Sequence, residues 1–190
     1  GRQVVPQVER LIAEYEALAV GADGDGEALA GTVVMGALVS ALMGAFADAL
    51  WAIRQEHPRL EVKLFAGQSG TFAEKVLRGE LDAAVVMQSP RPLPSSVAWT
   101  RLYGEPMVLI VPRRPHFRVP EDPIAILRSS PFIRFDRETW TGLLVKRVLR
   151  RTGVTVAEGM ELNSVEAIVA IVRQGFGVSI VPRLANVDWR

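Results

Sequence analysis

The stretch LEVKLFAGQSGTFAEKVLRGELDAAVVM, Leu60–Met87, decides the fold of this chain. Residues 60–65 alternate between apolar and polar side chains, which is typical of a half-buried β-strand. A turn of small residues follows at positions 67–70 and precedes a helical segment. The apolar run at 83–87 predicts a third element, a buried strand. Strand, turn, helix and strand in this order indicate a parallel β-sheet.

The helix between the two strands carries start and stop signals. Ser69 is a candidate N-cap, because its hydroxyl can accept a hydrogen bond from a free backbone N–H in the first turn. Phe72, Val76 and Leu77 have the spacing of one helix face, and we expect that face to point into the core. Gly79 is placed to end the helix, since glycine tolerates the left-handed conformation that follows a helix.

The same pattern extends toward the N-terminus. Residues 32–38 (TVVMGAL) predict a buried strand, and Ser40 is a candidate N-cap for a helix from about Ala41 to Glu56. Pro58 stops this helix. The expected apolar face consists of Leu42, Phe46, Ala49, Leu50 and Ile53.

The C-terminal half repeats the order of elements. Residues 97–103 and 106–112 predict two further strands, and a second α/β set follows. Its expected elements are a helix at 124–128, a strand at 132–135, a helix at 139–152, a strand at 155–162, a helix at 164–174 and a strand at 177–181. The interpretation is two α/β lobes, 29–104 and 105–190, joined near Gly104–Glu105.

Residues 1–28 form a separate unit in this interpretation, a helix and a hinge. Apolar residues in 3–19 recur at spacings of three and four, which predicts an amphipathic helix. The segment GADGDGEALAG follows as a hinge. A helix attached by a hinge lacks a core of its own, so we expect its apolar face to pack on another chain or domain.

The composition excludes several kinds of site. The 190-residue chain has a net charge of +1, no cysteine and two histidines, His57 and His116. These counts disfavour nucleic-acid binding by bulk charge, thiolate metal sites and histidine relays. Phosphate-loop, dinucleotide-loop, nucleophile-elbow and zinc-protease motifs are absent from the sequence. We therefore expect no catalytic residues, no cofactor and no metal: the protein binds rather than reacts, and is not an enzyme.

Ligands of open α/β sheets bind outside the carboxyl ends of the strands. Ser40, Ser69 and Ser164 follow predicted strands at helix starts, where free N–H groups favour an anion. Each serine is either a simple cap or a ligand contact, and Arg134 and Arg137 are either surface residues or added charge. The candidate site residues are Ser40, Gln68, Ser69, Gly70, Met87, Phe135, Trp140, Asn163 and Ser164. Trp140 fits a pocket wall or the core.

Four stretches in order resemble one known family: LAGTVVMGAL (29–38), RQEHPRLEVKLFAGQSGTFAEKVLRGELDAAVV (54–86), LYGEPMVLIVPRRPHF (102–117) and ELNSVEAIVAIVRQGFGVSIVP (161–182). Together they are similar to the effector-binding domain of LysR-type transcriptional regulators. The resemblance covers most of the chain and implies two Rossmann-like lobes of the type 2 periplasmic-binding-protein architecture, with an effector in the interlobe cleft. Segment 1–28 would then hold the dimerising linker helix and hinge.

The resemblance also implies the protein's setting. It predicts a cytoplasmic bacterial regulator that forms a homodimer or homotetramer, makes no membrane contact, and binds DNA only through an N-terminal winged helix-turn-helix missing here. The family's C-terminal return to the first lobe is also missing, so a trimmed domain is expected. Apolar Met87 favours a mixed apolar and acidic effector. The alternative is a solute-binding protein of a transport system, which has the same fold.

Overall fold

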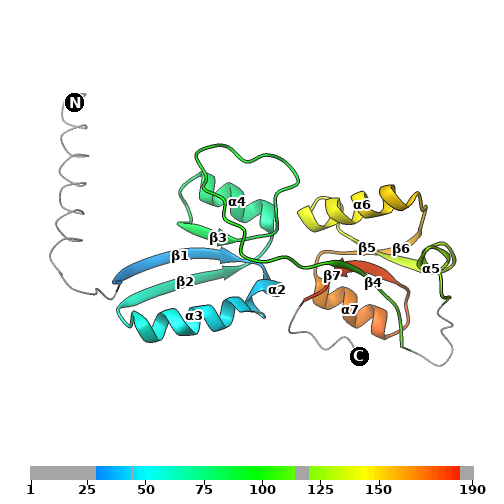
Figure 1. The fold of residues 1–190 in the computed structure, drawn as a ribbon, viewed down its shortest axis with the longest axis horizontal. Coiled ribbons are helices and arrows are strands. Elements are labelled where there is room, and N and C mark those ends of the chain that lie inside the picture. The colour runs from blue at the N-terminus through cyan, green and yellow to red at the C-terminus, as the bar shows by residue number, and fades with distance from the viewer. Residues whose placement is uncertain (1–28, 44, 114–119, 185–190) are drawn as a thin grey trace.

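The structure is a computed structural model that describes residues 29–43, 45–113 and 120–184. The amphipathic helix predicted at residues 3–19 and most of the hinge after it lie outside the described residues. Two groups of strands and helices form two lobes, and the segment between β3 and β4 crosses from one to the other (Figure 1).

Lobe I contains a three-stranded parallel sheet in the order β2-β1-β3. Its elements are β1 (Gly31–Ala37), α2 (Val39–Leu42), α3 (Ala45–Glu56), β2 (Leu60–Ala66), α4 (Ser69–Leu77) and β3 (Ala83–Val85). The helices α3 and α4 lie on opposite sides of this sheet (Figure 1). The β-α-β-α-β order predicted from residues 32–87 is therefore confirmed.

Packing in lobe I centres on Phe72, which is 4% exposed. A Cβ atom added at Gly36 would lie 2.5 Å from the Phe72 ring, and one added at Gly67 would lie 2.8 Å from it. Both glycines therefore allow the ring to lie against the backbone of β1 and of the turn before α4. Gly79 follows the last turn of α4 and has a φ of 70°, the left-handed conformation expected of a glycine after a helix.

Three expectations for lobe I are wrong in detail. The predicted helix 41–56 is divided into α2 and α3, and α2 already begins at Val39. Leu77, expected to face the core, is 40% exposed, and Ile53, on the expected apolar face of the preceding helix, is 39% exposed. Correct helical periodicity therefore did not guarantee burial at these two positions.

Lobe II contains four strands in two ladders. The strand β4 (Met107–Ile110) pairs antiparallel with β7 (Ser179–Pro182), and β5 (Pro131–Phe135) pairs in parallel with β6 (Ala157–Leu162). A parallel bridge between Phe132 and Val178 connects the two ladders. The helices are α5 (Pro123–Ser129), α6 (Trp140–Thr152) and α7 (Val165–Arg173).

The core of lobe II is larger than that of lobe I and surrounds β5 and β7. Phe132, Ile133, Val145, Ile168 and Val178 are each at most 1% exposed. Helices α6 and α7 cover opposite faces of the sheet, so each supplies one apolar face to this core (Figure 1).

The strand predicted at 97–103 is wrong. These residues form no strand, and Trp99, Leu102 and Tyr103 are exposed. No neighbouring strand among the described residues pairs with this segment, and an extended segment becomes a strand only through such pairing. The segment instead belongs to the connection between the lobes.

Candidate functional site

The carboxyl ends of the lobe I strands carry the first half of the candidate site. Because β1, β2 and β3 are parallel, all three end at one edge of the sheet, next to lobe II (Figure 1). The backbone N–H of Gly67 donates to Ala37 O at 3.2 Å, and that of Leu38 donates to Val85 O at 3.1 Å. These bonds hold the three strand ends together beyond the regular ladder.

Ser69 lies at this edge, but it is not the N-cap of α4. The N-cap is Gln68, which makes no side-chain capping bond, and Ser69 is the first helical residue. The Ser69 hydroxyl accepts a hydrogen bond from the backbone N–H of Met87 at 3.1 Å, and Ser69 is 4% exposed. The serine therefore fixes the chain after β3 against the start of α4.

Ser40 is not an N-cap either. Leu38 occupies that position, and Ser40 is the second residue of α2. Leu38 alone separates β1 from α2, so the helix begins before Ser40 is reached. Ser40 is half-buried at the same sheet edge.

The strand ends of lobe II supply the second half. Thr139 caps α6 by accepting from the N–H of Gly142 at 3.0 Å. Ser164 caps α7 by accepting from the N–H of Ala167 at 3.2 Å. The capping interpretation is therefore confirmed for Ser164. Its hydroxyl also donates to Glu166 Oε2 at 2.6 Å.

The two lobes touch at these strand ends. The side-chain amide of Gln68 donates to the backbone carbonyl of Asn163 at 3.0 Å. A Cβ atom added at Gly70 would lie 3.3 Å from Trp140 Nε1, so the indole lies directly beside α4. Four of the candidate residues, Gln68, Gly70, Trp140 and Asn163, thus meet at one interlobe contact, and the bonded pair Ser69 and Met87 adjoins it.

Thr141 is a contact residue that the sequence interpretation missed. Its hydroxyl donates to the sulfur of Met87 at 3.2 Å, and Thr141 is 8% exposed. A threonine in the first turn of a helix is common, so the sequence offered no signal that singled it out. Phe135, in contrast, is 3% exposed and belongs to the lobe II core, so its side chain does not line the cleft surface.

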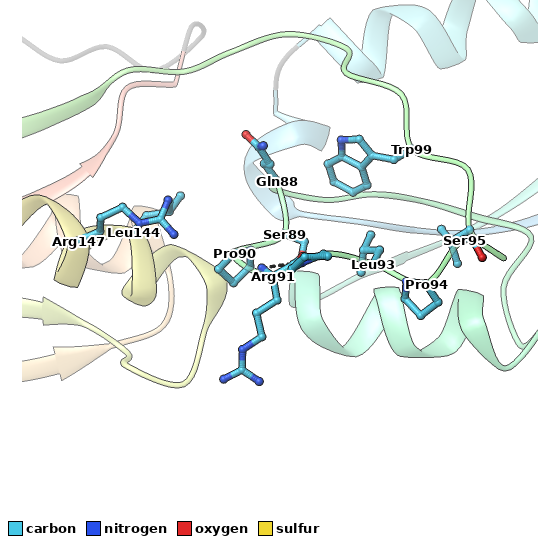
Figure 2. A pocket seen from close by; sticks show the side chains of 12 residues that line it. Gln88, Ser89, Pro90, Arg91, Leu93, Pro94, Ser95, Trp99, Leu144 and Arg147 are labelled. Atoms are coloured by element: carbon cyan, nitrogen blue, oxygen red, sulfur yellow. Dashed lines mark hydrogen bonds between the residues drawn. The ribbon is translucent and has the colours of Figure 1, made fainter.

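A separate pocket lies beside this contact, between the segment after β3 and helix α6 (Figure 2). Its volume is about 560 Å³. The lining consists of Gln88, Ser89, Pro90, Arg91, Pro92, Leu93, Pro94, Ser95, Val97, Trp99, Leu144 and Arg147. None of the nine candidate site residues belongs to it.

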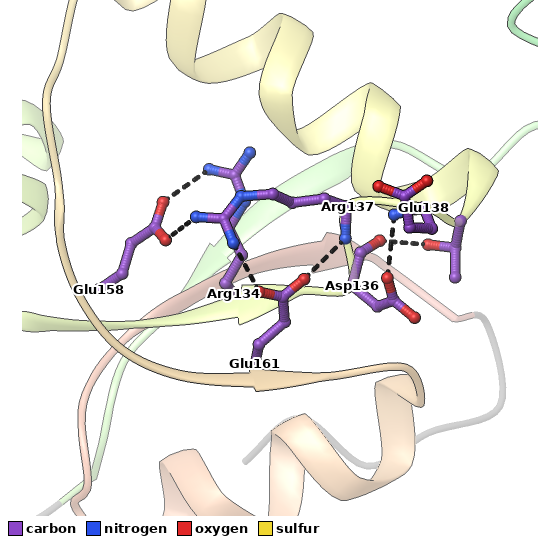
Figure 3. Close-up of polar contacts among 7 residues, drawn as sticks. Arg134, Asp136, Arg137, Glu138, Glu158 and Glu161 are labelled. Carbon is purple, nitrogen blue, oxygen red and sulfur yellow. Dashed lines mark hydrogen bonds and ion pairs between the residues drawn. The ribbon is translucent and has the colours of Figure 1, made fainter.

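Arg134 and Arg137 form an ion-pair network with Glu158 and Glu161 (Figure 3). Arg134, whose side chain is 6% exposed, has Nη1 at 3.4 Å from Glu158 Oε1. Arg137 pairs with Glu158 and donates from Nη1 to Glu161 Oε2 at 2.6 Å. The backbone N–H of Arg137 also donates to Glu161 Oε1 at 2.9 Å, so the network fixes the turn that leads into α6.

The interlobe crossing carries a titratable pair. Burial raises the pKa of the Glu105 carboxyl above its usual value. Burial, and then the nearby charge of Glu105, raise the pKa of Tyr103. Both groups are therefore disfavoured in their charged forms next to the junction of the lobes.

The described residues contain no group of three side chains suited to hold a metal ion. None of the described helices has the length and apolar character needed to cross a membrane.

What the interlobe edge offers is polar: a side-chain amide, helix N-termini, a hydroxyl and an indole N–H. Such groups can bind and orient a small molecule, and they form no acid–base or nucleophile arrangement.

The sequence profile of the family described as "LysR substrate binding domain" matches residues 26–189. The HTH-type transcriptional activator IlvY of Salmonella typhimurium is 28% identical over 191 residues, which cover 97% of this chain and 63% of that protein. The HTH-type transcriptional regulator IlvR of Caulobacter vibrioides is 26% identical and covers 100% of this chain and 66% of its own length. The chain thus spans less than two thirds of the length of these relatives.

Solved structures share the fold at low identity. HinK, a LysR family transcriptional regulator from Pseudomonas aeruginosa, has a TM-score of 0.66 and 18% identity, covering 96% of this chain and 62% of its own. The CcmR regulatory domain of Synechocystis PCC6803, in complex with 2-PG, has a TM-score of 0.66 and 22% identity. The match covers 83% of this chain and 75% of that domain's chain. The QuiR effector-binding domain, in complex with shikimate, has a TM-score of 0.65 and 14% identity. The match covers 83% of this chain and 76% of that domain's chain. The expected two-lobed periplasmic-binding-protein fold is confirmed.

Proposed function

This chain belongs to the LysR substrate-binding domain family, and from that premise we propose that it binds a small effector between its lobes for a bacterial transcriptional regulator. The candidate contacts are Ser40, Gln68, Ser69, Gly70, Met87, Trp140, Asn163 and Ser164. Thr141 is added because it touches Met87.

The observation that carries this proposal is the hydrogen bond from Gln68 to Asn163 O. It joins the carboxyl-end edges of both sheets, which is where ligands of open α/β folds bind. The amide of Gln68 can exchange this partner for an acceptor on a ligand, and Asn163 can do the same with a donor. A ligand that satisfies both groups would be held by both lobes at once.

The chemistry at this edge favours a small polar or acidic effector with an apolar part. The N-terminus of α7 and the indole N–H of Trp140 favour negative charge or an acceptor oxygen. The Met87 side chain offers apolar surface beside them. The molecules bound to two structural neighbours, 2-PG and shikimate, are small polar or acidic compounds.

Calorimetric titration of small organic acids against this chain tests the proposal. A Gln68→Ala change should weaken an identified effector by about 0.5–1.5 kcal/mol, the usual net value of one hydrogen bond. Gln55→Ala, which makes the same change at an exposed position on α3, is the matched control. Equal affinity in both variants would place the effector elsewhere.

The setting of the whole protein is part of the proposal. We place the regulator in the cytoplasm, with DNA binding in a winged helix-turn-helix segment not included in this chain, and with no catalytic activity. A mobility-shift assay should therefore show no sequence-specific DNA binding by this chain, whose net charge is only +1. A salt-sensitive specific shift at sub-micromolar concentration would contradict this.

We also propose that the chain self-associates as a dimer or tetramer. The apolar pattern of residues 3–19 and the exposed Trp51 on α3, which is 66% exposed, support this. Sedimentation should give dimers or larger species. A monomer at high concentration would contradict the proposal.

The alternative, a solute-binding protein of a transporter, is not favoured, because the relatives are transcriptional regulators.

A further inference from the structure

The pocket between the 88–99 segment and α6 is distinct from the proposed effector cleft. It shares no lining residue with the candidate contacts. The contact between Thr141 and Met87 borders the pocket, because Gln88 follows Met87 and Leu144 lies one helical turn beyond Thr141. Both lobes contribute, the first through the segment after β3 and the second through Leu144 and Arg147 of α6 (Figure 2).

The charge of this pocket is one-sided. Its lining contains two guanidinium groups, Arg91 and Arg147, and no acidic side chain. Among the described residues neither guanidinium has an ion-pair partner. The two side chains lie on either side of Pro90 (Figure 2), and both line the pocket without a counter-charge. Such a lining attracts an anion, and guanidinium groups bind carboxylate, sulfonate and phosphate oxygens with directional hydrogen bonds.

The rest of the lining is mostly apolar, with Gln88, Ser89 and Ser95 as its polar members, and its backbone is stiff. Pro90, Pro92 and Pro94 restrict the backbone of the segment, and the N–H of Arg91 donates to Ser89 Oγ at 3.2 Å. Trp99, 45% exposed, adds an aromatic ring to this lining (Figure 2). A pre-formed wall of this kind reduces the ordering that a ligand must impose. Its volume of about 560 Å³ is within the range of small-molecule sites.

From these features we propose that the pocket is a second ligand site, which takes a small organic anion with an apolar or aromatic body. The anionic group pairs with Arg91 and Arg147, and the body lies against the prolines, Leu144 and Trp99. Because Arg91 and Arg147 come from different lobes, one bound anion joins the lobes on the outer side of the cleft. The proposal does not depend on the identity of the cleft effector.

The fluorescent probe 8-anilinonaphthalene-1-sulfonate combines both chemical parts and tests the site. We expect Arg91→Gln and Arg147→Gln each to weaken its binding about tenfold, because each removes a charge-assisted hydrogen bond. Arg150→Gln is the matched control, since Arg150 is exposed on the same helix and does not line the pocket. Equal affinity in all variants, or an equal loss with Arg150→Gln, would overturn the proposal.

Two further measurements locate and classify the bound probe. Energy transfer from tryptophan to the probe should fall more with Trp99→Phe than with Trp140→Phe, whose side chain lies at the cleft. The reverse order would place the probe in the cleft and overturn the assignment. Inorganic phosphate should bind at least tenfold more weakly than the probe, since it lacks an apolar body. Phosphate binding of equal strength would overturn the assigned ligand class.

Discussion

The buried hydroxyl of Ser69 accepts a hydrogen bond from the backbone N–H of Met87, at 3.1 Å. This bond connects the start of α4 to the chain after β3, two segments that both reach the interlobe edge. Ser69 therefore has a structural function in addition to any contact with a ligand.

Replacement of Ser69 by alanine should destabilise the protein by about 1–3 kcal/mol, because the N–H of Met87 loses its partner in a part-buried position. Thermal and urea unfolding measure the effect. Ser40→Ala is the control, because Ser40 lies at the same edge and forms no hydrogen bond among the described residues. Equal stability of the two variants would refute a structural function for Ser69.

Glu158→Gln should destabilise lobe II by about 3 kcal/mol, since it leaves the buried guanidinium of Arg134 without its ion-pair partner. The estimate is at the low end of the usual range because Glu158 is 33% exposed. Urea unfolding monitored by circular dichroism measures it. Glu80→Gln breaks an exposed pair with Arg78 and should leave the melting temperature unchanged. An equal free energy of unfolding in both variants would show that the ion pair of buried Arg134 does not stabilise the protein.

Gly36→Ala should lower the free energy of unfolding by about 1–3 kcal/mol, because the new methyl group would meet the Phe72 ring at 2.5 Å. Gly159→Ala is the matched control, as its nearest neighbour would be Pro131 Cβ at 3.9 Å. Denaturant unfolding should show a loss for position 36 only. An equal loss at position 159 would indicate a general cost of alanine in these strands.

Glu105→Gln should stabilise the protein at neutral pH. Burial raises the pKa of the Glu105 carboxyl, so the folded state binds the proton more tightly than the unfolded state. Stability from this group is therefore gained as pH falls through the raised pKa and is lost above it. Melting temperatures from about pH 4 to about pH 8 should show the variant's advantage at the upper end and none at the lower. An exposed substitution, Glu121→Gln, controls for net charge.

Local sequence patterns predicted the elements and several of their ends. The alternation in residues 60–65 led to a strand that the structure contains, and the helix expected at 139–152 is α6. Thr139 was expected at the start of α6, Ser164 was a candidate cap, and Gly79 was expected to end α4. These signals work because a cap or a helix face depends on residues within about four positions.

The sequence by itself thus determined the α/β class, the order of elements and the edge at which polar groups gather. Only the tertiary structure decided that Ser69 binds the Met87 backbone, that Phe135 is core, and that 97–103 is no strand. It also decided that Gln68 meets Asn163, 95 positions away in the chain. Partners at that separation are set by how two lobes pack, and nothing in the neighbouring residues of either side chain encodes the distance between them.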